Sequence, residues 1–117
     1  MAKIQITDLF LRTIIGIHDW ERKNKQDVII NVVLEYNSLK ARQKDRIEEA
    51  VDYKSITKKI IAAVENSNFL LLERLADSVL HIVMEDKKVT QATVRIDKPH
   101  ALRFAKSVSV ELSARRK

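Results

Sequence analysis

The sequence contains no cysteine, one glycine and one proline among its 117 residues. Without cysteine it can form no disulfide, no cysteine-ligated zinc or iron–sulfur site and no thiol nucleophile. A single glycine, Gly16, excludes the glycine-rich phosphate loops of dinucleotide-binding and P-loop proteins, which need two or more. So little glycine and proline also argues against a collagen-like or linker sequence. The lack of cysteine is compatible with the cytoplasm, which we take as the default location.

Long apolar runs are also absent. The longest stretches, such as 69–72, are far too short to span a bilayer, and residues 1–6 lack the basic and apolar regions of a secretory signal. Six scattered aromatic residues offer no stacking platform for single-stranded nucleic acid. The formal net charge is +6, and half of it comes from the terminal basic residues 115–117. Such a charge is compatible with nucleic acid, a membrane surface or a phosphorylated metabolite.

Apolar residues make up 45% of the chain, enough to fill the core of a single domain over residues 1–117. Alternating and β-branched residues predict four strands, over 2–15, 28–36, 89–97 and 107–113. Helical spacing of apolar residues predicts one helix that begins at Asp52 or Ser55 and ends at 66–68, and a second over about 71–85. The order ββααββ is typical of an α+β fold with an antiparallel sheet and both helices on one face. Its two edge strands would be unpaired, so we expect oligomerisation through the sheet.

Two connections between these elements stand out in the sequence. Residues 17–27 are too many for a tight hairpin turn, which makes this loop a place to look for function. Its Trp20 and Glu21 could be an exposed pair or an oligomer contact. Residues 40–46 are polar and charged and predict a surface connection.

The histidines are not spaced like metal ligands, and we expect no metal site. His81 lies beside the apolar stripe of the second predicted helix, where a half-buried packing role is the ordinary one. His18, in the 17–27 loop, is expected in solvent.

Four other residues could contribute to a site. Lys98 precedes Pro99, which favours extended geometry and places the lysine at the tip of a strand, where solvent exposure is the simpler interpretation. Glu73 in the first turn of a helix is ordinarily a carboxylate favoured by the helix dipole. Tyr53, just before the first predicted helix, is ordinarily a core aromatic or part of a hydrophobic staple. Arg103, together with His100, could place positive charge near a substrate, or it could be a solvated turn residue.

Four segments resemble the dihydroneopterin aldolase family in order and spacing across essentially the whole chain: 16–21, 52–53, 71–76 and 97–101. Residues 26–31, and especially 97–105 with 107–109, resemble the dihydroneopterin triphosphate 2'-epimerase branch of that family. The Asp19-Trp20-Glu21 segment is instead similar to the aldolases. The resemblance therefore implies one of two activities and leaves the choice between them open.

The resemblance implies a tunnelling fold (T-fold), in which ββααββ subunits close into tetrameric β-barrels that stack as a homo-octamer. It also implies pterin sites between neighbouring subunits. Glu73 would accept two hydrogen bonds from the pterin, and the backbone of Leu72 would add a contact. Tyr53 from the neighbouring subunit would lie against the ring, and Glu21 would reach the substrate's side chain. Lys98 would be the proton donor and acceptor, and no cofactor would be needed.

The implied reaction breaks and re-forms the C1'–C2' bond. It would epimerise 7,8-dihydroneopterin triphosphate at C2' to dihydromonapterin triphosphate. The alternative is an aldolase that releases 6-hydroxymethyl-7,8-dihydropterin and glycolaldehyde for folate biosynthesis. From another class, a small basic nucleic-acid-binding domain would explain the net charge but would leave Glu73 and Lys98 unexplained. We therefore expect neither nucleic acid nor a membrane as a partner.

Overall fold

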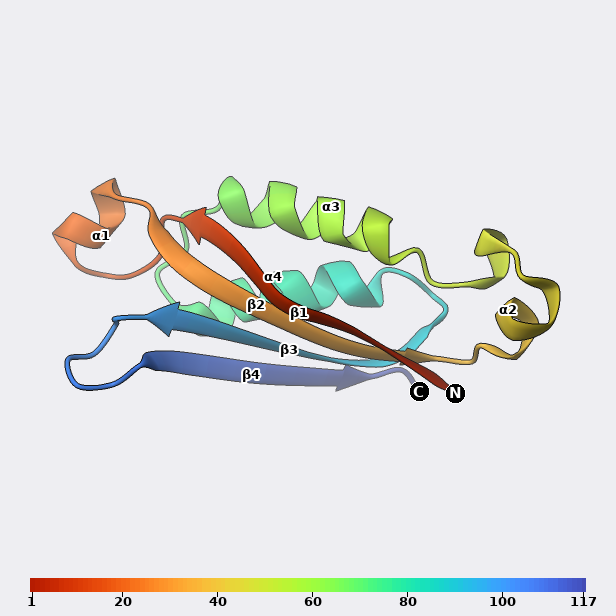
Figure 1. The fold of residues 1–117 in the computed structure, drawn as a ribbon. Helices are drawn as coiled ribbons and strands as arrows, with labels where there is room; N and C mark the ends of the chain where they lie inside the picture. Colours follow the sequence, from red (N-terminus) through yellow and green to blue (C-terminus); the bar gives the residue numbers. More distant parts are fainter.

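The computed structural model describes residues 1–117, and its elements run largely as the sequence predicts (Figure 1). The strands are β1 Ala2–Thr13, β2 Gln26–Tyr36, β3 Val89–Pro99 and β4 Ser107–Arg115. The two long helices are α3 Tyr53–Glu65 and α4 Leu72–Met84. Two short helices, α1 Asp19–Lys23 and α2 Leu39–Lys44, and a 3₁₀ turn at Ile47–Glu49 complete the chain.

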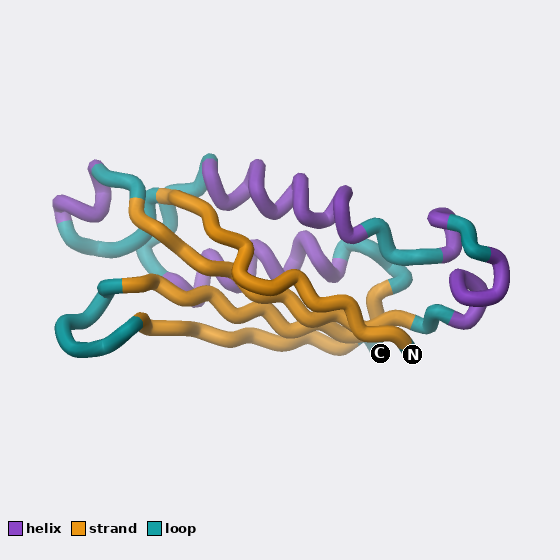
Figure 2. The backbone as a smooth tube through the Cα atoms, viewed as in Figure 1, coloured by secondary structure: helices purple, strands orange, loops and turns teal.

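The four strands form one antiparallel sheet in the order β1-β2-β3-β4. Strand β2 shows why one face must be covered, because every second residue from Val28 to Tyr36 is buried. Helices α3 and α4 cover that face, with α4 against β3 and β4 and α3 beside β1 (Figures 1 and 2). The α+β prediction with both helices on one face is confirmed. Strands β1 and β4 are the unpaired edges of the sheet within this chain.

The long helices begin and pack as their sequences predict. Asp52 is the N-cap of α3, and its carboxylate accepts a hydrogen bond from the Ser55 backbone N–H at 3.1 Å. Helix α4 buries five residues of the predicted stripe, from Leu75 to Val83. Burying that stripe against the sheet stabilises the helix far more than its intrinsic propensity does.

Three expectations are corrected, and two connections hold short helices that the sequence did not predict. The 17–27 loop contains α1, and α2 begins at Leu39, one residue before the 40–46 surface connection; each helix is too short to reveal a helical period. The side chain of His81 is 78% exposed, because it lies next to the buried stripe of α4 but points away from the sheet. Tyr53 is 52% exposed and is not a core residue. Lys98, for which solvent exposure was the simpler interpretation, is buried.

The molecule is elongated, with extents of 52 × 25 × 24 Å, so its two ends are distinct. One end carries α1, the start of α4, the end of β3 and the 99–107 loop; the other carries α2 and the start of α3 (Figure 1). No helix is long and apolar enough to cross a membrane. Most of the candidate residues gather at the first end.

Candidate functional site

Lys98 lies buried at the end of β3. The strand buries every second residue, Ala92, Val94 and Ile96, on the face covered by the helices, and Lys98 is the next in this register. Its side chain is only 11% exposed. A buried ammonium requires a partner that compensates its charge.

That partner is Glu21, which α1 brings to the same place from 77 residues away. The Lys98 Nζ donates a hydrogen bond to Glu21 Oε2, and the two side chains form an ion pair. The same oxygen accepts from Gln26 Nε2 at 3.1 Å, and Oε1 accepts from the His18 backbone N–H at 3.2 Å. The carboxylate thus accepts three hydrogen bonds, and its side chain is 13% exposed.

These donors lower the pKa of Glu21 from 4.5 to about 2. The Lys98 hydrogen bond is the largest cause, and it outweighs the desolvation that would raise the value; Gln26 and His18 add to the effect. Glu21 is therefore ionised at any physiological pH. The pair presents a fixed carboxylate and a buried proton donor to whatever occupies this end of the molecule.

The only glycine stands behind this carboxylate. Gly16 has φ +129°, a conformation that side chains rarely adopt, and a Cβ built on it would overlap the Glu21 carboxylate. Glycine is therefore required here for both its backbone freedom and its lack of a side chain. The sequence alone did not reveal this contact with Glu21.

Glu73 lies in the first turn of α4, at the same end of the molecule (Figure 1). Its side chain is exposed and makes no hydrogen bond or ion pair within the chain, in contrast to Glu21. Neighbouring Leu72 is half-buried. A carboxylate at a helix N-terminus, free of partners, has both oxygens available for a ligand that donates two hydrogen bonds.

Tyr53 is not part of this cluster in one chain. It is the first residue of α3, at the end that carries α2 (Figure 1). Residues at this end of α3 line a hollow together with the C-terminal part of α4, whereas Glu73 is at the start of α4. Within one chain Tyr53 therefore lies apart from Glu73 and Lys98.

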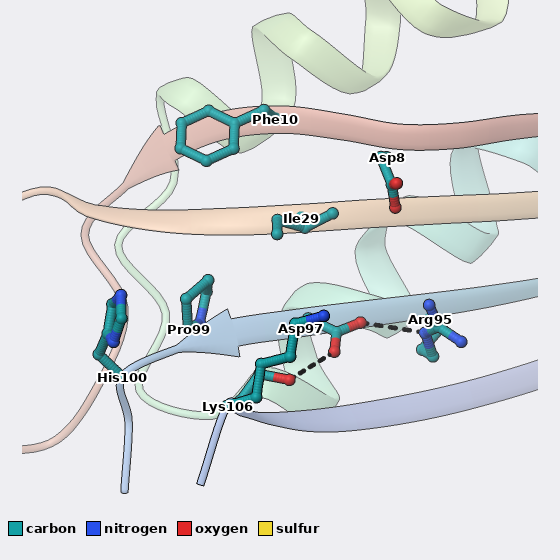
Figure 3. A pocket seen from close by; sticks show the side chains of 9 residues that line it. Asp8, Phe10, Ile29, Arg95, Asp97, Pro99, His100 and Lys106 are labelled. Carbon is teal, nitrogen blue, oxygen red and sulfur yellow. Dashed lines mark hydrogen bonds and ion pairs between the residues drawn. The ribbon is translucent and has the colours of Figure 1, made fainter. Parts of the chain in front are cut away.

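His100 and Arg103 lie in the loop that follows Lys98. His100 has φ +61° and its backbone N–H bonds the Lys106 carbonyl at 3.4 Å. It lines a cavity of about 400 Å³ on the sheet face that no helix covers, together with Asp97 and Phe10 (Figure 3). The guanidinium of exposed Arg103 lies over the ring of Phe104, 5.3 Å from its centroid, and forms no ion pair with a carboxylate of the chain. Neither residue forms a hydrogen bond or an ion pair with Lys98 or Glu21.

Sequence reasoning assigned no role to Gln26, although it lay within a segment used for the family resemblance. Its amide bridges the Glu21 carboxylate and the Ile15 carbonyl, at 3.1 and 2.8 Å. The available signal was the position of Gln26: it is an amide residue at the start of β2, directly after the segment that carries Glu21. No group of three or more histidine, aspartate or glutamate side chains is placed to hold a metal ion.

The family model FolB, dihydroneopterin aldolase, matches residues 4–113. The chain belongs to this family. A curated FolB relative from Pseudomonas aeruginosa, named dihydroneopterin triphosphate 2'-epimerase, is 50% identical over 99% of this chain and 94% of its own length. A relative from Escherichia coli named dihydroneopterin aldolase is 27% identical over 94% of this chain and 90% of its own.

The solved structure of E. coli dihydroneopterin aldolase in complex with neopterin superposes with a TM-score of 0.92 at 25% identity, covering 97% of this chain and 99% of that one. The FolB resemblance and the T-fold predicted from the sequence are thus confirmed. The higher identity to proteins named as epimerases agrees with the branch that residues 97–105 indicated.

Proposed function

We propose that this FolB protein is a dihydroneopterin triphosphate 2'-epimerase. The observation that carries the proposal is the buried Lys98–Glu21 pair at the end of β3, facing the end of the molecule where Glu73 is free. The 50% identity to a protein named for this activity favours the epimerase over the aldolase. A nucleic-acid-binding role has no support, because the matched family and the relatives are pterin enzymes.

The proposed ligand is a pterin, as in the E. coli aldolase complex with neopterin. The 2-amino group and N3–H of a pterin form a two-donor edge, and the free Glu73 carboxylate matches it as a two-acceptor fork. The backbone of Leu72 adds a contact beside it. Glu21, whose carboxylate is fixed by three donors, reaches the hydroxylated side chain of the substrate.

The reaction needs proton transfers, and Lys98 is placed to make them. Its ammonium donates a proton to N5 of the ring, and the resulting amine accepts the proton of the 2'-hydroxyl. The C1'–C2' bond then breaks, its electron pair enters the N5=C6 imine to form an enamine, and the 2'-oxygen becomes that of an aldehyde. The ring thus serves as the electron sink, and no cofactor takes part.

Epimerisation follows if the aldehyde is kept. The enamine C1' attacks the other face of the aldehyde carbon, the new alkoxide takes a proton and N5 gives one up, so that only the configuration at C2' has changed. If the aldehyde leaves first, the enamine is protonated at C1' and the outcome is the aldolase reaction. A triphosphate on the aldehyde fragment favours retention where cations hold it.

The site is proposed to be completed in a homo-oligomer, an octamer of two stacked tetrameric rings. Two features support this proposal. Tyr53 and Glu73 lie at opposite ends of the elongated molecule, and both edge strands of the sheet are unpaired within one chain. A neighbouring copy would supply Tyr53 to stack on the pterin ring.

Product analysis tests the proposal. Purified protein is incubated with 7,8-dihydroneopterin triphosphate and, separately, with unphosphorylated 7,8-dihydroneopterin, and the products are separated by chromatography. We expect inversion at C2' of the triphosphate to be the faster reaction. Lys98→Ala should lose turnover by orders of magnitude with little loss of pterin affinity, since the lysine moves protons and does not hold the ring. Faster release of glycolaldehyde from the unphosphorylated substrate would make the protein an aldolase.

A further inference from the structure

Arg22, the residue after Glu21, makes an unusual set of contacts. Its guanidinium donates to three backbone carbonyls: Gly16 at 3.0 Å, Phe69 at 3.1 Å and Asn68 at 2.6 Å. It forms no ion pair with a carboxylate. Its neighbour Lys23 is exposed, whereas Arg22 is half-buried. Two nitrogens of the planar guanidinium share these three bonds, whereas all the donors of a lysine are on a single nitrogen.

Helix α1 has little else to hold it in place. It has five residues and none of them is buried, and Trp20 is 62% exposed. A helix this short is unstable on its own, so its position depends on contacts to the rest of the molecule. Those contacts are the donors on Glu21 and the three carbonyl bonds of Arg22.

The carbonyls that Arg22 binds belong to two functional parts of the site. Gly16 supports the Glu21 carboxylate from behind. Asn68 and Phe69 lie in the irregular segment 66–71 that leads directly into α4 and Glu73. The Gly16 N–H also bonds the Phe69 carbonyl at 3.2 Å. Arg22 therefore joins the segment that holds the Lys98–Glu21 pair to the segment that presents Glu73.

We propose that Arg22 is a positioning residue for the pterin reaction. It fixes α1 on segment 66–71, so that Glu21 stays aligned with Lys98 while a pterin ring is bound at Glu73. The inference rests on the proposed function for its catalytic consequence. Its structural consequence, the placement of Glu21, can be measured without any turnover.

The test compares Arg22→Gln with Lys23→Gln, a matched loss of one positive charge from the same helix. We expect Arg22→Gln to lower kcat on the order of 100-fold with a much smaller change in KM, because a displacement of about 1 Å at a catalytic group has an effect of that size. Lys23→Gln should behave like the wild type. Equal kinetics in the two variants would overturn the inference.

A second measurement is independent of activity. The Glu21 carboxyl is titrated by NMR, and its pKa should rise from about 2 toward its usual value in Arg22→Gln but not in Lys23→Gln. An unchanged Glu21 pKa in folded Arg22→Gln would overturn the proposal even if the wild type converted no pterin. Should Arg22→Gln not fold, Arg22→Lys, which keeps the charge but not the fork, serves in both measurements with the same expected directions.

Discussion

The backbone of Gly16 lies directly against the carboxylate of Glu21, with no room for a side chain between them. The position combines a positive φ of +129° with this close approach, so two separate constraints select glycine. Both constraints bear on the geometry of Glu21, whose carboxylate accepts from Lys98, Gln26 and the His18 backbone at this place.

We first predict that Gly16→Ala destabilises the protein by about 1–3 kcal/mol from backbone strain, and that displacement of the Glu21 carboxylate adds to this cost. Urea unfolding of the single variant, of Glu21→Ala and of the double variant separates the two effects. The cost of Gly16→Ala should be smaller in the Glu21→Ala background. An equal cost in both backgrounds would show that the methyl group does not act through Glu21.

The second prediction concerns acid stability. The pKa of Glu21 is depressed from 4.5 to about 2, so the folded state binds this proton less readily than the unfolded state does. The ionised Glu21 carboxylate therefore stabilises the folded state above pH 4.5, and this contribution is lost as the pH falls toward 2. Unfolding free energies measured across that range should depend less on pH in Glu21→Gln than in the wild type. The control, exposed Glu65→Gln, should follow the wild type.

Much of the fold follows from local patterns, and the site follows from them only in part. The alternation along β3 and the stripe of α4 identify the buried face without any tertiary information. In the structure this alternation continues to Lys98, one residue beyond the predicted strand, although a lysine at a strand tip is ordinarily solvated. Its burial depends on Glu21, 77 residues earlier, and no local pattern reveals such a pairing.

Local sequence patterns could not predict helix α1 or the role of Tyr53, for two different reasons. Helix α1 is held by contacts from Arg22 and Glu21 to distant segments, so its five residues carry no periodic signal of their own. The role of Tyr53 was supplied by the family resemblance alone. The structure adds that Tyr53 is exposed at the far end of the chain, which is a necessary condition for sharing it with a neighbour.

Glu73→Gln is predicted to weaken pterin binding by about 2 kcal/mol or more, roughly 30-fold, because it removes the charge and one acceptor of the fork. Titration of a non-reactive oxidised pterin, followed by fluorescence, measures the affinity. Glu85→Gln, an exposed carboxylate at the other end of the same helix, is the matched control. Unchanged affinity in Glu73→Gln would place the ring elsewhere.

Mixing of inactive subunits tests whether the site is shared. Tyr53→Ala and Lys98→Ala subunits are dissociated, combined and reassembled. Tyr53 and Lys98 lie at opposite ends of the molecule, at the start of α3 and the end of β3. Some interfaces of the mixed oligomer should then combine an intact Tyr53 from one subunit with an intact Lys98 from the next, and part of the activity should return. Mass spectrometry of differently tagged subunits confirms the mixing. No recovery in oligomers shown to be mixed would contradict a site built from two copies.

The last prediction concerns the choice between retaining and releasing the aldehyde. Arg103 lies five residues beyond Lys98 in the exposed 99–107 loop, where its guanidinium stacks on Phe104 and has no carboxylate partner. An unpaired guanidinium can bind two phosphate oxygens at once, so Arg103 is suited to hold the triphosphate of the cleaved fragment beside the enamine until it re-adds.

Arg103→Ala should therefore slow epimerisation of dihydroneopterin triphosphate and leave cleavage of unphosphorylated dihydroneopterin nearly unchanged. The ratio of the first rate to the second should fall. Lys106→Ala removes the same charge from the same loop and controls for its general electrostatic effect. The rates of both reactions are measured for the wild type, Arg103→Ala and Lys106→Ala. If Arg103→Ala slowed both substrates equally, or if Lys106→Ala reproduced its effect, the arginine would have no specific role in retention. Retention would then have to come from the enclosure of the site rather than from a phosphate contact on this loop.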